Sequence, residues 1–395
     1  MSYSIEKNRG RKTNVIVLFA ICFYFFIAFF EPYLNNVIGS VTKYYIVALI
    51  GILLLFNNKY RIRGTQIAFA LWLAYKMISV FWAGDTSVAQ LHFFSQVGMI
   101  GLLIVLTSVE FSKRDIDAVI FTELIGSSII GVLSLFFSQP YHGINEARQV
   151  LVLFGNECDP NNIAAFLCIG SIIAFYYLIT GRKYRLICAL LFVVNTYSCL
   201  QTGSRAGLIT IVVSCVLIFL FCSSYKKMST RIRFFVVFAA LLALLYFIIT
   251  RFLPDVIYMR LFDYQSYEGG SERTEIWKTV WELCLEDLNL IFGAGWGAYH
   301  GYNGMDAAVH NTFLSMLSDV GLIGCTLFFA PIAWRSIFYL KERMYLPLFL
   351  LAAAFVPSFF LEAINKRFFW NAIMIFFMYI NVYSDYKSGI RESNI

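Results

Sequence analysis

Two arginines and a histidine are the residues of this sequence whose types and places best suit chemistry. Arg205 lies in the run Gln201-Thr-Gly-Ser-Arg205-Ala-Gly207 at the start of an apolar segment, and Arg273 lies in the first turn of an expected helix. His310 directly precedes Asn311, which can cap another helix. Arginine binds phosphate or carboxylate through paired, charge-assisted hydrogen bonds, and histidine exchanges protons near neutral pH. Because the helix dipole disfavours a cation at a helix N-terminus unless an anion is near, the two arginines indicate an anionic partner.

Each of these residues also has a simpler interpretation. Arg205 could be an interfacial arginine that extends its charge to water, or it could pair with an acidic residue. Glu272 and Glu275 could solvate Arg273 at the surface of its helix. His310 could serve only as a polar anchor at the water–membrane boundary. From position alone, these alternatives stay open.

The sequence contains no recognisable metal or nucleotide site. His300 and Asp306 lie near His310 but form no metal-binding pattern, because no pair of histidines has helical spacing. There is no Gly-x-x-x-x-Gly-Lys-[Ser/Thr] loop, and the glycines of residues 293–297 are typical of a tight turn after a helix. We therefore expect no metal and no cofactor.

The elements that must position these residues are membrane helices. Hydrophobic residues make up 59% of the chain and charged residues 14%, whereas soluble domains carry about 25% charged residues. Mean hydropathy is +0.71. The net charge of +7 is divided into small basic clusters between apolar runs, which argues against nucleic acid as a partner. The composition predicts an all-α, polytopic membrane protein.

About twelve transmembrane helices are expected, with both termini in the cytoplasm. With this assignment about 21 of the 31 lysine and arginine residues fall on the cytoplasmic side and about eight on the other side, in agreement with the positive-inside rule. The expected spans are residues 14–30, 37–56, 66–82, 90–109, 116–138, 162–180, 186–200, 206–222, 234–250, 311–334, 344–361 and 367–384.

Two long polar stretches, residues 139–162 and 251–310, are expected on the outer side. The chain then divides into helices 1–9 (residues 1–250), a large external loop (251–310), and helices 10–12 with a cytoplasmic tail (311–395). Ser271 can cap an amphipathic loop helix that the glycine run ends, and this helix should lie on the membrane or pack over the spans. Cys158 and Cys284 both fall outside, so a disulfide between them is left open.

Six short motifs follow one another between residues 155 and 330. They are Asp159-Pro160-Asn161-Asn162-Ile-Ala164, Gly203-Ser204-Arg205-Ala-Gly-Leu208, Ser271-Glu-Arg273-Thr-Glu-Ile-Trp277, Phe292-Gly293-Ala-Gly295, His310-Asn311-Thr-Phe313-Leu314 and Gly321-Leu-Ile-Gly324. No single motif is specific, but the ordered set with its loop placement resembles the O-antigen ligase and polymerase family of bacterial polysaccharide assembly.

The resemblance implies a GT-C-like, metal-independent glycosyltransferase at the outer face of the bacterial cytoplasmic (inner) membrane. Its donor would be a glycan on polyprenyl diphosphate. The matching residues would be Arg205 and Arg273 as diphosphate-binding arginines and His310 as the catalytic or acceptor-orienting histidine, with Asn161 and Asn311 as further substrate-binding residues. The expected partners are the lipid-linked donor and acceptor and membrane lipid, and a chain-length regulator protein is left open.

Two reactions of this family and one function of a different class remain as alternatives for this protein. A polymerase adds the glycan to another lipid-linked repeat unit, whereas a ligase transfers it to lipid A core, and the Pro160-Asn161-Asn162 and Gly203-Ser204-Arg205 runs favour a polymerase. A lipid-linked oligosaccharide flippase or a transporter would also fit a span count near twelve. Such a protein should show internal repeats and several charged spans, whereas we expect only Lys76 deep in a span and find no repeat.

Overall fold

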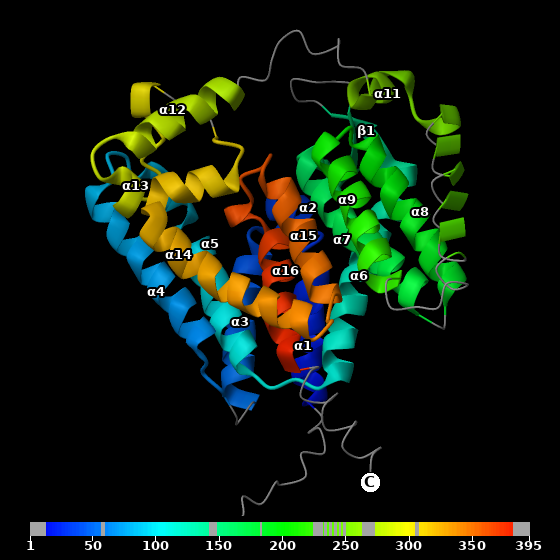
Figure 1. The fold of residues 1–395 in the computed structure, drawn as a ribbon, viewed down its shortest axis with the longest axis horizontal. Helices are drawn as coiled ribbons and strands as arrows, with labels where there is room; N and C mark the ends of the chain where they lie inside the picture. Colours follow the sequence, from blue (N-terminus) through cyan, green and yellow to red (C-terminus); the bar gives the residue numbers. More distant parts are fainter. Residues whose placement is uncertain are drawn as a thin grey trace, which may run out of the picture.

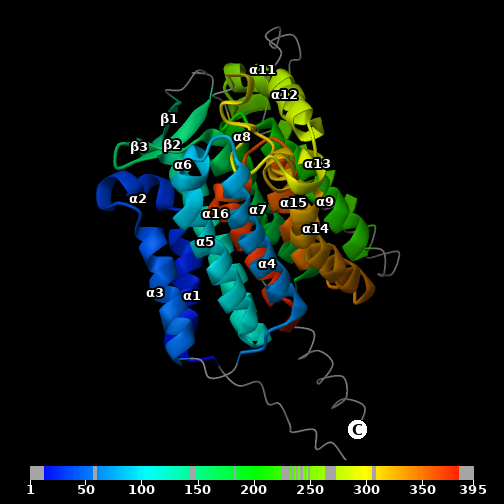
Figure 2. The same ribbon diagram turned by 90° about the vertical axis from the view of Figure 1, so that its left-hand side faces the viewer.

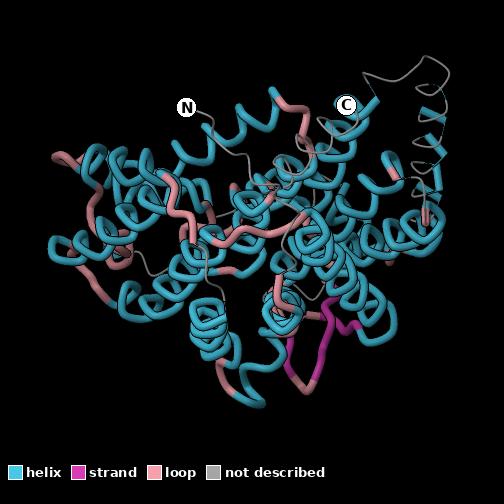
Figure 3. Tube along the Cα trace, turned by 90° about the horizontal axis from the view of Figure 1, so that it is seen from below, coloured by secondary structure: helices cyan, strands magenta, loops and turns pink. Residues whose placement is uncertain are grey.

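The computed structural model describes residues 13–56, 60–141, 148–181, 184–223, 250–262, 273–304 and 308–381, with scattered positions between 232 and 247. Helices dominate this part of the chain (Figure 3). They are α1 (Val15–Ile27), α2 (Glu31–Ile38), α3 (Val41–Phe56), α4 (Gly64–Ile78), α5 (Ser87–Ser108), α6 (Lys113–Phe137), α7 (Pro160–Thr180), α8 (Arg185–Gln201), α9 (Arg205–Ser223), α11 (Asp255–Phe262), α12 (Arg273–Leu285), α13 (Asn289–Phe292), α14 (Thr312–Lys341), α15 (Leu346–Ser358) and α16 (Arg367–Met378).

Eleven of the expected spans coincide with described helices. Within the described ranges, six helices are long and apolar enough to cross a membrane, and α1, α3, α8, α15 and α16 are shorter apolar helices. The span expected at residues 234–250 lies largely outside the described residues, so the count of twelve stays a prediction. Large apolar side chains such as Phe81 and Leu186 are 90% and 84% exposed, as expected for surfaces that face lipid.

One end of the bundle carries most of the connecting structure. In Figure 1, α12 and α13 lie above α4 and α14 on one side, and α11 lies above α8 and α9 on the other. The helices α1, α2, α15 and α16 lie between these two sides. We call this the loop end; it corresponds to the side that the sequence predicts to be outside. Figure 2 shows the strands and α2 at the same end.

The outer polar stretch between α6 and α7 contains short strands, which the sequence did not predict. Strands β1 (Ser138–Pro140), β2 (Gln149–Leu153) and β3 (Asn156–Glu157) form a three-stranded antiparallel sheet in the order β1-β2-β3. Phe154 and Gly155 both have positive φ and make the tight turn between β2 and β3. The strands are too short for an alternating pattern to reveal them.

Helix α14 is bent where it meets the external loop. Gly321 has φ 59° and ψ −168°, which interrupts the helix, and a side chain there would collide with the backbone of Ile291. Ala294 N donates to Ser318 O at 2.7 Å, so the glycine run lies directly on this bend. The glycine run ends α13 rather than the loop helix α12, which corrects the sequence prediction.

Helix α12 packs over α14, which is one of the two placements that its amphipathic pattern predicted. The cluster that it forms with the loop contains the buried residues Val280, Leu283, Cys284, Ala294, Tyr299 and Val309. Cys158 and Cys284 are both free thiols, so the disulfide left open by the sequence does not form.

Lys76 is not the only charge buried in a span. Its Nζ lies 3.0 Å from Asp319 Oδ2 and 4.7 Å from the centre of the Trp296 ring, and Asp319 Oδ1 accepts a hydrogen bond from Gly297 N at 2.8 Å. Glu123 on α6 is also fully buried and accepts from Asn371 at 2.7 Å. The Lys76–Asp319 pair therefore joins α4, α14 and the glycine run.

Candidate functional site

The site begins at the N-terminus of α7, where the Asp-Pro-Asn motif forms a helix cap. The Asp159 carboxylate accepts hydrogen bonds from Asn161 N at 2.9 Å and Asn162 N at 3.1 Å, and Pro160 occupies the first turn. This is the arrangement that acidic cap residues and an early proline favour. The cap turns the Asn161 side chain toward the neighbouring turn between α8 and α9.

Asn161 connects two of the motifs. Its Oδ1 accepts hydrogen bonds from Arg148 Nη2 at 2.8 Å and from Ser204 Oγ at 3.0 Å, and Arg148 Nε donates to Thr202 O at 2.8 Å. Arg148 is 7% exposed. Because its guanidinium contacts both segments, it holds the start of α7 against the turn that precedes Arg205. Sequence reasoning did not single out Arg148, which lies in the loop before β2 with no motif around it.

The run Gly203-Ser204-Arg205-Ala-Gly207 forms the turn after α8 and the start of α9. Gly203 has φ 64° in the turn after α8, and Ser204 Oγ accepts from Gly207 N at 3.3 Å at the start of α9. A Cβ on Gly207 would lie 2.7 Å from Cys199 Sγ, so glycine lets α9 approach α8 closely. Arg205, half-buried, is thus the first residue of α9, as the sequence predicts.

Arg273 and His310 are brought together by α12. Arg273 is the first residue of this helix, and Trp277 follows it one turn later on the same face. Trp277 Nε1 donates to Val309 O at 2.8 Å, which fixes the residue directly before His310. His310 has φ 51°, a conformation that is uncommon for a residue with a side chain and is typical of sites where the surroundings hold the backbone.

Charged residues from three other parts of the chain shift the pKa of His310. Burial lowers the pKa of His310 below its ordinary value, and the Arg273 cation lowers it further. Asp159, at the start of α7, raises the pKa of His310. Lys366, between α15 and α16, is a second cation that lowers this pKa. His310 is therefore held in its neutral form near pH 7, the form that can accept a proton.

The segment after His310 is tied to the loop between α15 and α16. The Asn311 side chain caps α14 by accepting from Phe313 N and Leu314 N, both at 3.1 Å. Thr312 N and Oγ1 donate to Leu361 O at 3.1 and 2.6 Å, and Ala363 N donates to Thr312 Oγ1 at 2.7 Å. The Asn311 side-chain oxygen Oδ1 thus caps α14. The predicted contact of Asn311 with the substrate stays a prediction.

At the loop end, His310 and the three charged residues that act on its pKa, Arg273, Asp159 and Lys366, make up what we call the His310 group. Arg273 and Asp159 both act on His310, and Asp159 caps the helix turn that contains Asn161. Arg205 directly follows Ser204, which donates to Asn161, and its convergence with Arg273 and His310 stays a prediction. Their roles toward a substrate stay predictions. Sequence reasoning missed two residues here, Arg148 and Lys366.

His300 does not belong to the His310 group. Its Nδ1 lies 3.5 Å from Asp85 Oδ2 at the start of α5, and Asp306 lies outside the described residues. Within the described ranges, no three or more His, Cys, Asp or Glu side chains gather in a way that could hold a metal ion.

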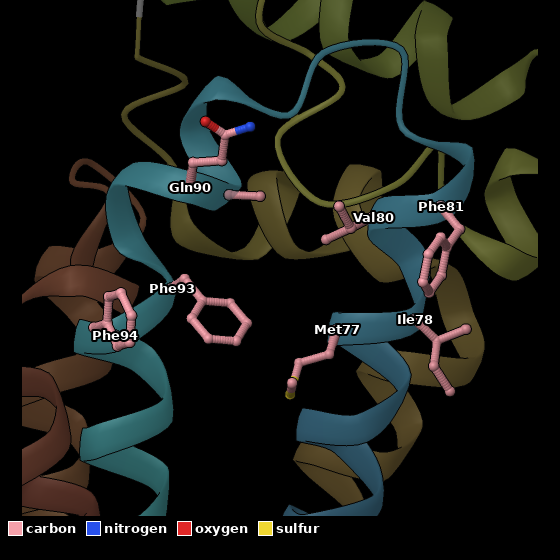
Figure 4. Close-up of a pocket in the computed structure, with 8 residues that line it drawn as sticks. Met77, Ile78, Val80, Phe81, Gln90, Phe93 and Phe94 are labelled. Atoms are coloured by element: carbon pink, nitrogen blue, oxygen red, sulfur yellow. The ribbon is translucent and has the colours of Figure 1, made fainter.

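An apolar pocket of about 600 Å³ opens between the loop-end parts of α4 and α5 (Figure 4). Gln90 is its one polar lining side chain among apolar residues that include Met77, Phe81 and Phe93. Phe93 also stacks on Trp296, with ring centres 6.3 Å apart. The lining contains none of the predicted site residues, so the pocket is separate from the His310 group.

The fold and this group of side chains define a multi-pass membrane protein that gathers arginine, lysine and histidine at its loop end. Residues 187–329 match a family model described as O-antigen ligase, which confirms the resemblance to the O-antigen ligase and polymerase family over that segment. The match includes Arg205, Arg273 and His310 and indicates a membrane enzyme of the ligase or polymerase type. A comparison with curated proteins finds no match.

Proposed function

We propose that this chain is a membrane glycosyltransferase that polymerises oligosaccharide repeat units carried on polyprenyl diphosphate. It would act at the outer face of the bacterial cytoplasmic membrane and invert the anomeric carbon. The observation that carries the proposal is the connection of Arg273 to His310 through Trp277 and Val309, beside the Asp159 cap of α7. A cation and a neutral histidine then face one substrate at the loop end.

The charges suit the departure of a diphosphate. Breaking the bond between the anomeric carbon and the diphosphate oxygen places negative charge on the leaving group. Preorganised arginines at helix N-termini stabilise that charge in the transition state, because their donors and the helix dipoles already point to where it develops. Arg205 and Arg273 are each the first residue of their helices, α9 and α12.

The proposed transfer step involves one bond made and one broken. The acceptor hydroxyl oxygen attacks the anomeric carbon of the donor, and the electron pair of the broken bond leaves with the polyprenyl diphosphate. The hydroxyl proton goes to His310, whose lowered pKa keeps the imidazole neutral and able to accept it. No nucleotide is consumed, because the donor is already activated.

The test uses purified protein in lipid nanodiscs with one defined lipid-linked repeat unit. A polymerase should convert it into a ladder of longer lipid-linked glycans, with and without a metal chelator. A parallel reaction offers lipid A core as the acceptor. A ladder that is lost in chelator and restored by one particular metal would contradict the metal-independent reaction. No product with either acceptor would contradict the transferase.

Ligation to lipid A core is the second candidate, because the matching family model is described as O-antigen ligase. Glycan transferred to lipid A core, with no ladder on the lipid carrier, would support a ligase instead. A flippase would move intact lipid-linked oligosaccharide without changing its length. The assay separates it by showing unchanged substrate in both reactions.

A further inference from the structure

The side-chain amide of Asn161 has a fixed orientation at the start of α7. Its Oδ1 lies 2.8 Å from Arg148 Nη2 and 3.0 Å from Ser204 Oγ. A guanidinium only donates hydrogen bonds, so the atom that faces Arg148 must be the amide oxygen and not the amide nitrogen. Ser204 Oγ accepts from Gly207 N and gives its own hydrogen to Asn161 Oδ1. Two donors therefore fix which way the amide is turned.

Arg148 is itself held in place. Its side chain is 7% exposed, and its Nε donates to Thr202 O at 2.8 Å while Nη2 donates to Asn161. The planar guanidinium presents its donors in a rigid fork, so the bond to the Thr202 carbonyl also fixes the direction of Nη2. Arg148 thus turns the oxygen of the Asn161 amide toward the protein interior.

The nitrogen of this amide, Nδ2, is left on the accessible side. Oδ1 and Nδ2 project in different directions from the amide carbon, and Asn161 is only half-buried. Among the residues that the structure describes, no acceptor lies within hydrogen-bond distance of Nδ2, and the atom is not enclosed. Asn161 Nδ2 is therefore a donor that a ligand can reach.

The backbone donors of the first α7 turn are already in use. Pro160 has no N–H, and Asn161 N and Asn162 N donate to Asp159 Oδ1. Ile163 N donates to Asp159 O at 3.2 Å. A ligand at this turn therefore meets side chains, of which Asn161 offers an oriented N–H donor.

The neighbours of Asn161 indicate which oxygen its amide contacts. Ser204 directly precedes Arg205, the predicted diphosphate-binding residue at the start of α9. We propose that Arg148 is a positioning residue, which turns the Asn161 amide so that Nδ2 donates a hydrogen bond to a phosphate oxygen of the lipid-linked donor. The inference rests on the proposed function and gives a role to Arg148, which lies outside the segment that the family model matches.

The experiment separates the donor role of Asn161 from its structural bonds. Asn161→Asp keeps an oxygen for Arg148 and Ser204 but replaces the outward N–H donor by a second oxygen. Wild type, Asn161→Asp and Asn161→Ala are compared in nanodiscs by direct binding of polyprenyl diphosphate, by donor KM and kcat, and by thermal unfolding. Gln139→Glu is the matched control, because it makes the same amide-to-carboxylate change on an exposed residue of β1.

Asn161→Asp should be at least as stable as wild type, since its carboxylate pairs with the Arg148 guanidinium. It should bind polyprenyl diphosphate about ten- to a hundredfold more weakly, because the donor is lost and two anions then meet. Donor KM should rise by a similar factor while kcat changes by less than about threefold. Asn161→Ala, which adds no charge, should weaken binding about tenfold, and Gln139→Glu should leave binding and stability unchanged.

Arg148→Met tests the positioning role, because it removes the donors that orient the amide. Alone it should weaken binding by about three- to tenfold. In the Asn161→Ala background it should cause no further loss of binding, since no amide remains to be oriented, although the unfolding temperature still falls. A further loss of binding in that background would show that Arg148 does not act through Asn161.

Wild-type binding by a well-inserted Asn161→Asp protein would overturn the inference, because the structural bonds of Asn161 survive in that variant. So would an equal loss in Gln139→Glu, which would show a general effect of added negative charge. Failure of wild type to transfer glycan, with its polyprenyl diphosphate binding still dependent on Asn161, would count against the proposed function alone.

Discussion

Arg273 and Arg205 carry the sharpest prediction at the scale of single residues. If they hold the diphosphate as charge develops, Arg→Ala at either position should lower the transfer rate by about two to three powers of ten. The transfer rate of the Arg→Lys variants should lie between those of wild type and the Arg→Ala variants, because lysine keeps the charge and loses the paired hydrogen bonds. The rate is measured per molecule inserted in the membrane, with Lys278→Ala as the control on α12. Normal polymer from well-inserted Arg273→Ala protein would end this mechanism.

His310 predicts a particular dependence on pH. Burial and then Arg273 lower its pKa below the ordinary value of 6.5, so it is neutral at pH 7 and becomes protonated only in more acidic solution. As a general base it works when neutral, so kcat/KM should fall as pH drops through this lowered pKa. Arg273→Gln removes one lowering charge and should move the fall to higher pH.

The same pH series includes His310→Ala, which should lose most polymer formation and the acidic fall together while the protein stays inserted. Asp159 raises and Lys366 lowers the pKa of His310, so Lys366→Gln should shift the fall in the same direction as Arg273→Gln. An unchanged acidic fall in His310→Ala would assign the titration to another group.

At the scale of elements, Arg148 connects β2, α7 and the turn before α9. Arg148→Lys should lower the free energy of unfolding by about 1.5–3 kcal/mol, the range for lost hydrogen bonds to a charged group. Combined with Asn161→Ala, it should cost less than the two single changes added together, because they remove one shared contact. Unfolding is followed in detergent, with Arg185→Lys as the control, since Arg185 Nε makes an exposed bond to Gly181 O at 2.7 Å. Strictly additive effects would contradict the coupling.

The Lys76–Asp319 pair is the element-scale link between the external loop and the spans. Asp319→Leu alone leaves the buried Lys76 without its partner and should cost about 3–5 kcal/mol of stability. Lys76→Met with Asp319→Leu should recover part of that loss, because no unpaired charge then remains buried. Thermal unfolding of the three variants in detergent measures this. A double variant less stable than both single variants would contradict the ion-pair explanation.

For the whole molecule, the distribution of basic residues predicts which end faces the cytoplasm. A cysteine at position 227, in a variant without the nine native cysteines, should be shielded from an impermeant thiol reagent added outside. A cysteine at position 278, on α12 at the loop end, should react. Labelling at position 227 from outside would show that the true topology is the reverse of the predicted one. The loop end, with the proposed site, would then face the cytoplasm.

The sequence by itself determined the membrane class, the position of eleven apolar helices and the helix-start placement of Arg205, Arg273 and Asn311. These properties follow from local patterns, since apolar runs and capping residues act over a few turns. The sheet between α6 and α7 was missed because its strands are short, and the bend at Gly321 because it depends on contact with Ile291.

Only the tertiary structure decided how the motifs meet. Arg148 lies in no motif, and its role depends on a hydrogen bond to Thr202, which lies 54 residues further along the chain. The same holds for Lys76, whose partner Asp319 lies more than 200 residues away. A side chain's charge partners are set by how helices pack, and packing joins positions that no local pattern relates.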